Sequence, residues 1–146
     1  MQETTLVSAA IPAADLLSSY AIAYLGTVSA GEPLEPVEGN DRLKIPPILL
    51  SGGKNFALRV RGDSMVGDGV RDGDILIVQR QRKARNGQMV IAVVNGEATL
   101  KRIYRTEERV ELRPSNPEMK SIFLDESSGS VEVRGVVIGL IRRFLA

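Results

Sequence analysis

The decapeptide FALRVRGDSM (residues 56–65) joins a strand pattern to a turn that carries a serine. Every second side chain of Phe56–Val60 is large and apolar, which predicts a half-buried β-strand. Gly62 permits a turn that a residue with a Cβ would resist, and Ser64 follows on that turn. A serine at the end of a strand suits a nucleophile, and it equally suits an ordinary turn. A catalytic role therefore depends on a base elsewhere in the chain.

The composition restricts what that base can be. The 146 residues include no histidine and no cysteine, which excludes Ser-His-Asp catalysis, thiol catalysis, disulfides and most transition-metal sites. If Ser64 is a nucleophile, its base is a lysine, a carboxylate or the amino terminus of the chain. We expect neither a metal nor a cofactor.

The rest of the chain predicts a mainly β protein. It has 14 glycines and 7 prolines for turns, and 43% apolar residues for a core. Further strands are predicted at Tyr20–Val28, Asp74–Val78, Gln88–Val94, Glu97–Tyr104, Arg109–Arg113 and Val131–Ile141. The apolar run at Gln88–Val94 predicts a strand covered on both faces, and Asn95-Gly96 predicts a type I′ hairpin after it. Short, evenly spaced strands favour a compact mixed sheet or a partly open barrel.

The first 41 residues differ from the rest in charge. They carry six acids and no base, whereas residues 42–146 carry 19 bases and 12 acids. We expect residues 1–41 to form a flexible arm or linker, with a short helix at Pro12–Leu17, and residues 42–146 to form the folded domain. Within the arm, SAGEP (residues 29–33) is small and flexible, which suits either a protease cleavage site or a simple linker.

Glu35–Gly53 contains three prolines and three glycines, which predicts a long connection with Ile48-Leu49-Leu50 as its apolar anchor. No apolar run approaches the roughly 18 residues that span a bilayer. The first 41 residues also lack the lysine or arginine with which a signal peptide begins. We therefore expect a cytoplasmic protein without membrane contact.

Lys101 is the lysine best placed to act as a base. Of the five lysines, it alone lies well inside a predicted strand, next to the strand that is covered on both faces. Both faces of Glu97–Tyr104 carry apolar residues, so the periodicity does not show whether Lys101 is buried, and a solvated lysine is the ordinary outcome. A catalytic lysine needs burial that lowers its pKa from about 10.4 toward neutrality, a change worth about 5 kcal/mol.

In sequence order, these segments resemble the self-cleaving S24 peptidases related to LexA and UmuD, which have a Ser-Lys dyad. The resemblance covers roughly residues 23–143 and is strongest to the C-terminal domain of LexA repressors. Six segments carry it: LGTVSAGEP from Leu25, VRGDSM from Val60, DGD from Asp72, ARNGQ from Ala84, ATLKR from Ala98 and GVVIG from Gly135. Each segment alone is a weak signal, but their shared order makes the resemblance specific.

The resemblance implies the compact β fold of these peptidases and a reaction within one chain. Ser64 attacks the carbonyl of Ala30, so the bond between Ala30 and Gly31 is cut. Lys101, neutral and buried, takes the proton of the serine and delivers it to the amine of Gly31.

The same resemblance assigns the surroundings of this reaction. The backbone N–H groups of Asp63 and Ser64 hold the developing oxyanion. Val28 and Ser29 pack into the cleft beside the scissile bond. Ala23 stands where LexA often has proline, which leaves the start of the cleavage strand open.

The resemblance further implies an SOS-response transcriptional repressor domain whose self-cleavage is stimulated by a RecA filament on single-stranded DNA. DNA contact is expected only through a winged-helix domain, which does not fit before Ala23. The alternative is a UmuD-like accessory subunit of a translesion polymerase. Signal-peptidase-like cleavage in trans also uses a Ser-Lys pair, but the chain lacks the expected membrane anchor. A homodimer is implied, and Val131–Ile141 offers an apolar strand for pairing.

Overall fold

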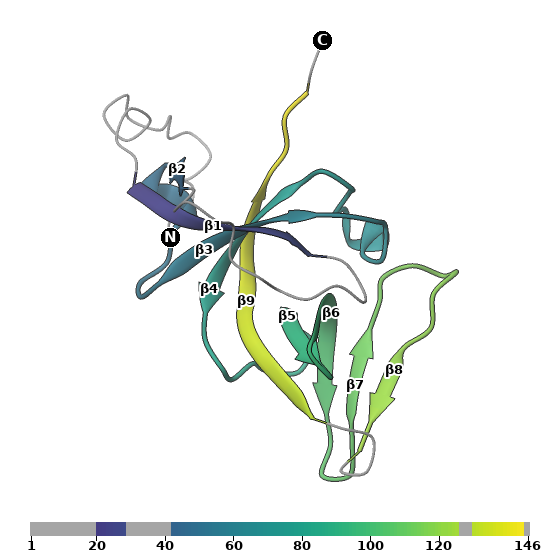
Figure 1. Ribbon diagram of the computed structural model, residues 1–146. Helices are drawn as coiled ribbons and strands as arrows, with labels where there is room; N and C mark the ends of the chain where they lie inside the picture. Colours follow the sequence, from purple (N-terminus) through teal and green to yellow (C-terminus); the bar gives the residue numbers. More distant parts are fainter. Residues whose placement is uncertain (1–19, 29–41, 126–129, 145–146) are drawn as a thin grey trace, which may run out of the picture.

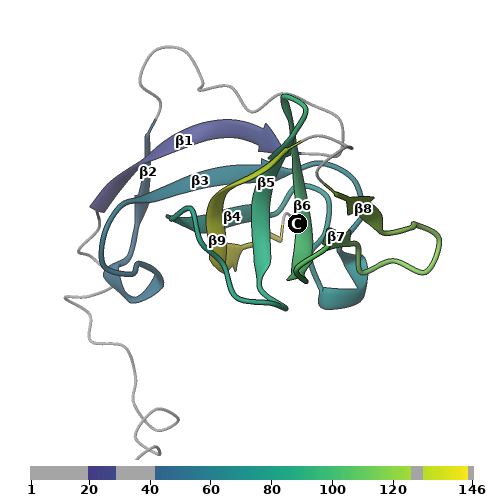
Figure 2. The same ribbon diagram turned by 90° about the horizontal axis from the view of Figure 1, so that it is seen from below.

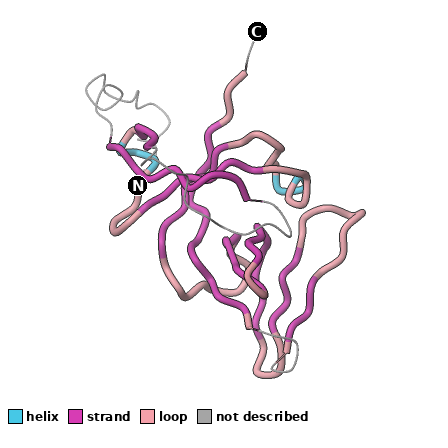
Figure 3. The backbone as a smooth tube through the Cα atoms, viewed as in Figure 1, coloured by secondary structure: helices cyan, strands magenta, loops and turns pink. Residues whose placement is uncertain are grey.

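The computed structural model of the chain describes residues 20–28, 42–125 and 130–144. Strands predominate in this part, and its only helical segments are two short 3-10 turns (Figure 3). The elements are β1 (Tyr20–Val28), β2 (Arg42–Ile45), η1 (Pro47–Leu49), β3 (Asn55–Val60), η2 (Val66–Asp68), β4 (Ile75–Arg80), β5 (Met89–Val94), β6 (Glu97–Arg105), β7 (Val110–Arg113), β8 (Ile122–Leu124) and β9 (Val131–Ile141). The prediction of a mainly β fold is confirmed.

The strands form one mixed sheet in the order β2-β1-β3-β4-β9-β5-β6-β7-β8. Neighbouring strands are antiparallel except β1 and β3, which run parallel. Although β1 and β6 lie far apart in this order, they contact each other because the sheet curls. The end of β1 lies near β6 in both views (Figures 1 and 2). The curl thus brings the first described strand close to the strand that carries Lys101.

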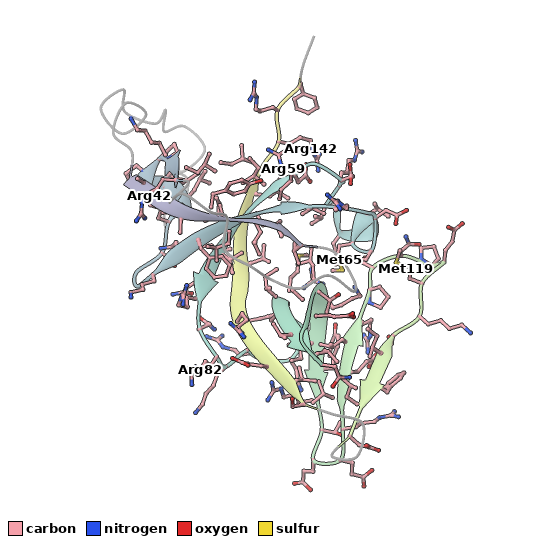
Figure 4. All side chains as sticks on the ribbon, viewed as in Figure 1. Arg42, Arg59, Met65, Arg82, Met119 and Arg142 are labelled. Carbon is pink, nitrogen blue, oxygen red and sulfur yellow. The ribbon has the colours of Figure 1, made fainter. Side chains whose placement is uncertain are left out.

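Apolar side chains cover both faces of the central strands. One buried cluster joins the end of β1 to strands β3 to β6, and it contains Val28, Leu58 and Ile91. Met65 belongs to the same cluster and points inward from the turn after β3 (Figure 4). A second cluster, formed by strands β5 to β9, contains Val90. Because Val90 and Ile91 are consecutive and belong to different clusters, β5 is covered on both faces, as predicted.

The hairpin between β5 and β6 has the predicted turn. Asn95 and Gly96 have φ angles of 51° and 85°, and a type I′ turn needs positive φ at both of these positions. The turn sets the register in which Val90 pairs with Lys101. The buried strand β5 therefore lies directly beside the lysine that the sequence singled out.

The prediction of a long connection at Glu35–Gly53 is wrong for its described part, where β2 and η1 lie. β2 pairs antiparallel with β1, and its four residues are too few to establish a strand pattern in the sequence. Ile48 is 64% exposed and anchors nothing, whereas Leu49 and Leu50 pack against a third apolar cluster. β8 was likewise not predicted, because three residues are too few to show a period.

The described residues include part of the predicted arm. Residues 1–19 and 29–41, and with them the predicted helix at Pro12–Leu17, lie outside the described residues. Between them, β1 lies inside the sheet, and its Ile22 is buried in the third cluster. The division at residue 41 stays a prediction. No helix in the described part is long and apolar enough to cross a membrane.

Candidate active site

Ser64 lies on the turn that follows β3. Gly62 has a φ of 92°, a conformation that favours glycine, and its N–H donates to the carboxylate of Asp72 at 2.8 Å. Ser64 itself is half-buried, and its Oγ lies 3.5 Å from the carbonyl oxygen of Leu100 on β6. The turn therefore presents the serine to the strand that carries Lys101.

Lys101 is 3% exposed and lies at the centre of β6. Its neighbours Thr99 and Leu100 are also buried, so both faces of β6 are covered and the question that the periodicity left open is answered. Lys101 Nζ donates to Thr99 Oγ1 at 2.8 Å and to the Leu100 carbonyl oxygen at 3.1 Å. Among the described residues, no carboxylate pairs with this amine.

The burial of Lys101 changes its acid–base behaviour. Desolvation lowers the pKa of the ammonium group from its ordinary value near 10.5 to about 8. The charged form loses more hydration free energy than the neutral form when water is removed, so burial favours the neutral amine. About a tenth of the molecules then have a neutral lysine at pH 7. Lys101 can therefore accept a proton at a pH where an exposed lysine cannot.

The two side chains converge on one backbone oxygen. Both Ser64 Oγ and Lys101 Nζ are within hydrogen-bond reach of the Leu100 carbonyl, at 3.5 and 3.1 Å. Within the described residues, no direct hydrogen bond joins the serine oxygen to the lysine nitrogen. The structure thus brings the two predicted residues to the same carbonyl group.

The predicted oxyanion donors lie on the same turn. Among the described residues, the backbone N–H groups of Asp63 and Ser64 have no hydrogen-bond acceptor, whereas the carbonyl groups of both residues have donors. Backbone N–H groups that are held in place and lack an acceptor are the ordinary components of an oxyanion hole.

The predicted cleavage segment begins at the end of β1. Val28 is 1% exposed and pairs with Val60, and its carbonyl oxygen accepts a hydrogen bond from the backbone N–H of Arg61 at 3.0 Å. Residues 29–31, which contain the predicted scissile bond, lie outside the described residues. The last described residue before them is therefore fixed beside the start of the serine turn.

The loop Pro114–Pro117 contributes contacts that the sequence did not predict. The backbone N–H of Ser115 donates to the Ser64 carbonyl at 2.8 Å, and the Asn116 side chain donates to the Asp63 carbonyl at 2.9 Å. Thr99 was also missed as a partner of Lys101. Its position two residues before the lysine, on the same face of β6, was the available signal.

Comparison with known proteins agrees with this geometry. The Peptidase S24-like family matches residues 23–138. A LexA repressor from Syntrophobacter fumaroxidans is 50% identical over 123 residues, which cover 84% of this chain and 59% of the relative. A LexA repressor from Syntrophotalea carbinolica is 44% identical over 82% of this chain and 58% of the relative. A third, from Thermotoga petrophila, is 43% identical over 84% of this chain and 62% of the relative.

The chain spans about three fifths of the length of these curated relatives. The family match extends from within β1 to within β9, so it includes the serine turn, the lysine strand and the end of β1. The chain therefore belongs to the Peptidase S24-like family.

Proposed function

We propose that this chain is the self-cleaving C-terminal domain of a LexA-type repressor, which cuts its own bond between Ala30 and Gly31. The observation that carries the proposal is the parallel pairing of β1 with β3, in which the Val28 carbonyl accepts the Arg61 N–H. Two residues of extended chain span at most about 7 Å. The chain length beyond Val28 therefore allows the Ala30 carbonyl to reach Ser64, which lies three residues beyond Arg61.

The first half of the reaction forms an ester. Neutral Lys101 takes the proton from Ser64 Oγ while that oxygen bonds to the carbonyl carbon of Ala30. The resulting oxyanion accepts hydrogen bonds from the N–H groups of Asp63 and Ser64. When the bond between Ala30 and Gly31 breaks, Lys101 gives its proton to the leaving amine of Gly31. Ala30 is then esterified to the serine.

The second half of the reaction restores the enzyme. Lys101, neutral again, takes a proton from a water molecule that attacks the ester carbonyl, and the proton passes to Ser64 as the ester bond breaks. Val28 supports the reaction from the N-terminal side of the scissile bond, because its buried side chain fixes where the segment leaves the sheet. In this proposal Ser29 binds beside Val28, and the small side chain of Ala30 and the lack of a side chain at Gly31 allow a close approach to Ser64.

The wider role of the protein follows from its relatives. The three relatives reported above are named LexA repressors, which favours this role over a UmuD-like polymerase accessory and over cleavage in trans. We propose that a winged-helix domain of the whole protein binds DNA, that two copies form a homodimer, and that a RecA filament on single-stranded DNA stimulates the cleavage. Cutting after Ala30 would then separate the DNA-binding part from the dimer and end repression in the cytoplasm.

Mass spectrometry of the purified chain at alkaline pH tests this proposal. We expect two fragments that end at Ala30 and begin at Gly31, formed with first-order kinetics at a rate that does not depend on protein concentration. Ser64→Ala is expected to abolish both fragments. Ser51→Ala, which changes another half-buried serine far from the site, is the matched control and is expected to cleave normally. Cleavage by the Ser64→Ala variant would refute the assignment of the nucleophile.

A further inference from the structure

We propose that Asn116 is a positioning residue for this reaction, because its side chain orients the peptide group that carries the Ser64 N–H. The inference rests on the proposed function and adds a residue to it. Asn116 Nδ2 donates a hydrogen bond to the carbonyl oxygen of Asp63 at 2.9 Å. The contact joins the loop after β7 to the serine turn, across 53 residues of sequence.

The argument depends on the planarity of the peptide group. The Asp63 carbonyl and the Ser64 N–H belong to one peptide, and in a trans peptide these two groups point in opposite directions. The Asp63 carbonyl also accepts the Val66 N–H within the turn at 3.3 Å, and Asn116 adds the shorter hydrogen bond from outside the turn, which helps to fix the direction of the N–H on the other side. A hydrogen bond to a carbonyl also polarises the peptide and strengthens its N–H as a donor. Both effects favour stabilisation of the oxyanion.

The side chain of Asn116 has only one orientation that satisfies its surroundings. Its Oδ1 accepts a hydrogen bond from the backbone N–H of Glu118 at 2.9 Å, so the amide nitrogen must face Asp63. An aspartate at this position would keep the first contact and would place a carboxylate oxygen against the Asp63 carbonyl oxygen. The site therefore requires an amide and not only a polar side chain of this size.

Ser115 attaches the same loop to the turn at two further points. Its N–H donates to the Ser64 carbonyl at 2.8 Å, and its carbonyl accepts from the Gly67 N–H at 2.7 Å. A Cβ at Gly67 would lie 2.5 Å from Ser115 Oγ and 2.8 Å from its carbonyl oxygen, so glycine is needed for this close approach. Three hydrogen bonds thus hold the loop against the turn, and Asn116 is the member that acts on the oxyanion donor.

The test measures self-cleavage of the whole chain as a function of pH. In Asn116→Ala and Asn116→Asp, we expect the rate on the alkaline plateau to fall about tenfold to a hundredfold. This is less than the loss of a complete oxyanion donor, which lowers kcat by about 10²-fold to 10³-fold. The midpoint of the pH profile, which reports Lys101, is expected to stay near 8. Asn116→Asp keeps the shape of the side chain and its bond to Glu118, so it removes the donor without removing the loop contact.

Asn55→Ala is the matched control. The Asn55 side chain is half-buried, donates to the Ser51 carbonyl at 2.9 Å and accepts from the Ser51 N–H at 3.4 Å, so it makes the same two kinds of contact at the far end of β3. We expect its cleavage rate to equal that of the unchanged chain, with thermal unfolding followed in parallel for all variants.

The outcomes separate this inference from the proposed function. If both Asn116 variants are folded and cleave within twofold of the unchanged chain, while Ser64→Ala does not cleave, Asn116 has no positioning role and the dyad stands. A shift of the pH midpoint with an unchanged plateau would also overturn the inference, because Asn116 would then act on Lys101. If Ser64→Ala cleaves, the proposed function fails and this inference fails with it.

Discussion

Lys101 and Asp74 are both ionisable side chains in the interior, with 3% and 1% exposure, and their surroundings are opposite. Asp74 accepts two hydrogen bonds from the guanidinium of Arg142 and one from the Arg71 N–H, each at 2.7 Å. Arg142 and Arg59 lie near each other at this end of the molecule (Figure 4) and line the same pocket. Lys101 donates only to uncharged oxygens of Thr99 and Leu100.

The comparison shows how one fold separates stability from reactivity. The hydrogen bonds from Arg142 hold the pKa of Asp74 below its ordinary value near 3.8, which favours the charged form. Burial without a counter-ion lowers the pKa of Lys101 to about 8, which favours the neutral form. The paired charge fixes the turn between β3 and β4, whereas the amine without a counter-ion is the base of the proposed reaction, at the expense of stability.

Replacing Lys101 with methionine should have the largest effects: the cleavage rate should fall and the stability should rise. We expect the cleavage rate to fall by at least about 10³-fold, because the general base is lost. We also expect the free energy of unfolding at pH 7 to rise by about 3 kcal/mol, which is the penalty that corresponds to lowering the pKa from 10.5 to about 8. Urea denaturation at several pH values measures the second effect.

The size of this stability difference decreases with pH in a defined window. Between about pH 8 and 10.5 the unfolded chain binds more protons at residue 101 than the folded chain, so the stability of the unchanged protein should rise with pH and approach that of Lys101→Met. Lys120→Met, which changes an exposed lysine, serves as the control and should alter neither cleavage nor stability. If Lys101→Met were less stable than the unchanged protein at pH 7, the conclusion that buried Lys101 lowers stability would be contradicted.

The pH dependence of cleavage should show the second largest effect. A base with a pKa of about 8 is neutral in about 1% of molecules at pH 6 and in about 90% at pH 9. The first-order rate should therefore rise about 90-fold over this range and level off above pH 9. Quantifying the two fragments by mass spectrometry in a series of buffers gives the profile. A midpoint near 10.5 would mean that Lys101 is solvated in the reacting state.

Asp74→Asn should affect stability and leave the chemistry intact. The substitution removes the charge that pairs with Arg142 while keeping the shape of the side chain, and we expect the free energy of unfolding to fall by about 2 kcal/mol. The pH midpoint of cleavage should stay near 8, because Asp74 does not contact Lys101. Denaturation at pH 7 tests the first effect, and a shift in that midpoint would show that the two buried groups are coupled.

Thr99→Val should have the smallest effect and should act on the lysine alone. Its hydroxyl accepts a hydrogen bond from Lys101 Nζ at 2.8 Å, and this contact favours the charged amine more than the neutral one. We expect its loss to lower the midpoint of the cleavage profile by about half a unit. An upward shift would mean that Thr99 stabilises the neutral form instead.

The sequence predicted the parts of the fold that depend on local pattern. The run at Val131–Ile141 and the turn at Asn95-Gly96 lie where the pattern placed them. β2 was missed because its position depends on pairing with β1, which no local signal specifies. The parallel pairing of β1 with β3 was missed for the same reason.

The candidate site divides in a similar way. Ser64 was found by its place on the turn after a predicted strand, and Lys101 by the exclusion of other bases and its place inside a predicted strand. The structure brings both to one carbonyl. The burial of Lys101 was implied by the resemblance but could not be predicted from the periodicity, because both faces of β6 carry apolar residues and the packing of distant strands decides what covers them. Asn116 was not found because its contact depends on how two distant loops meet.

The position of β1 between β2 and β3 has a consequence for what happens after the bond is cut. β2 lies at the edge of the sheet and pairs only with β1 among the described strands. In the proposed reaction, β1 and β2 end up on different polypeptides, although in the uncut chain Ile22 and Val28 are buried and β1 pairs with both β2 and β3. The product is a split protein, so the lifetime of this fragment complex, as well as the hydrolysis rate, would set how quickly the N-terminal part is released.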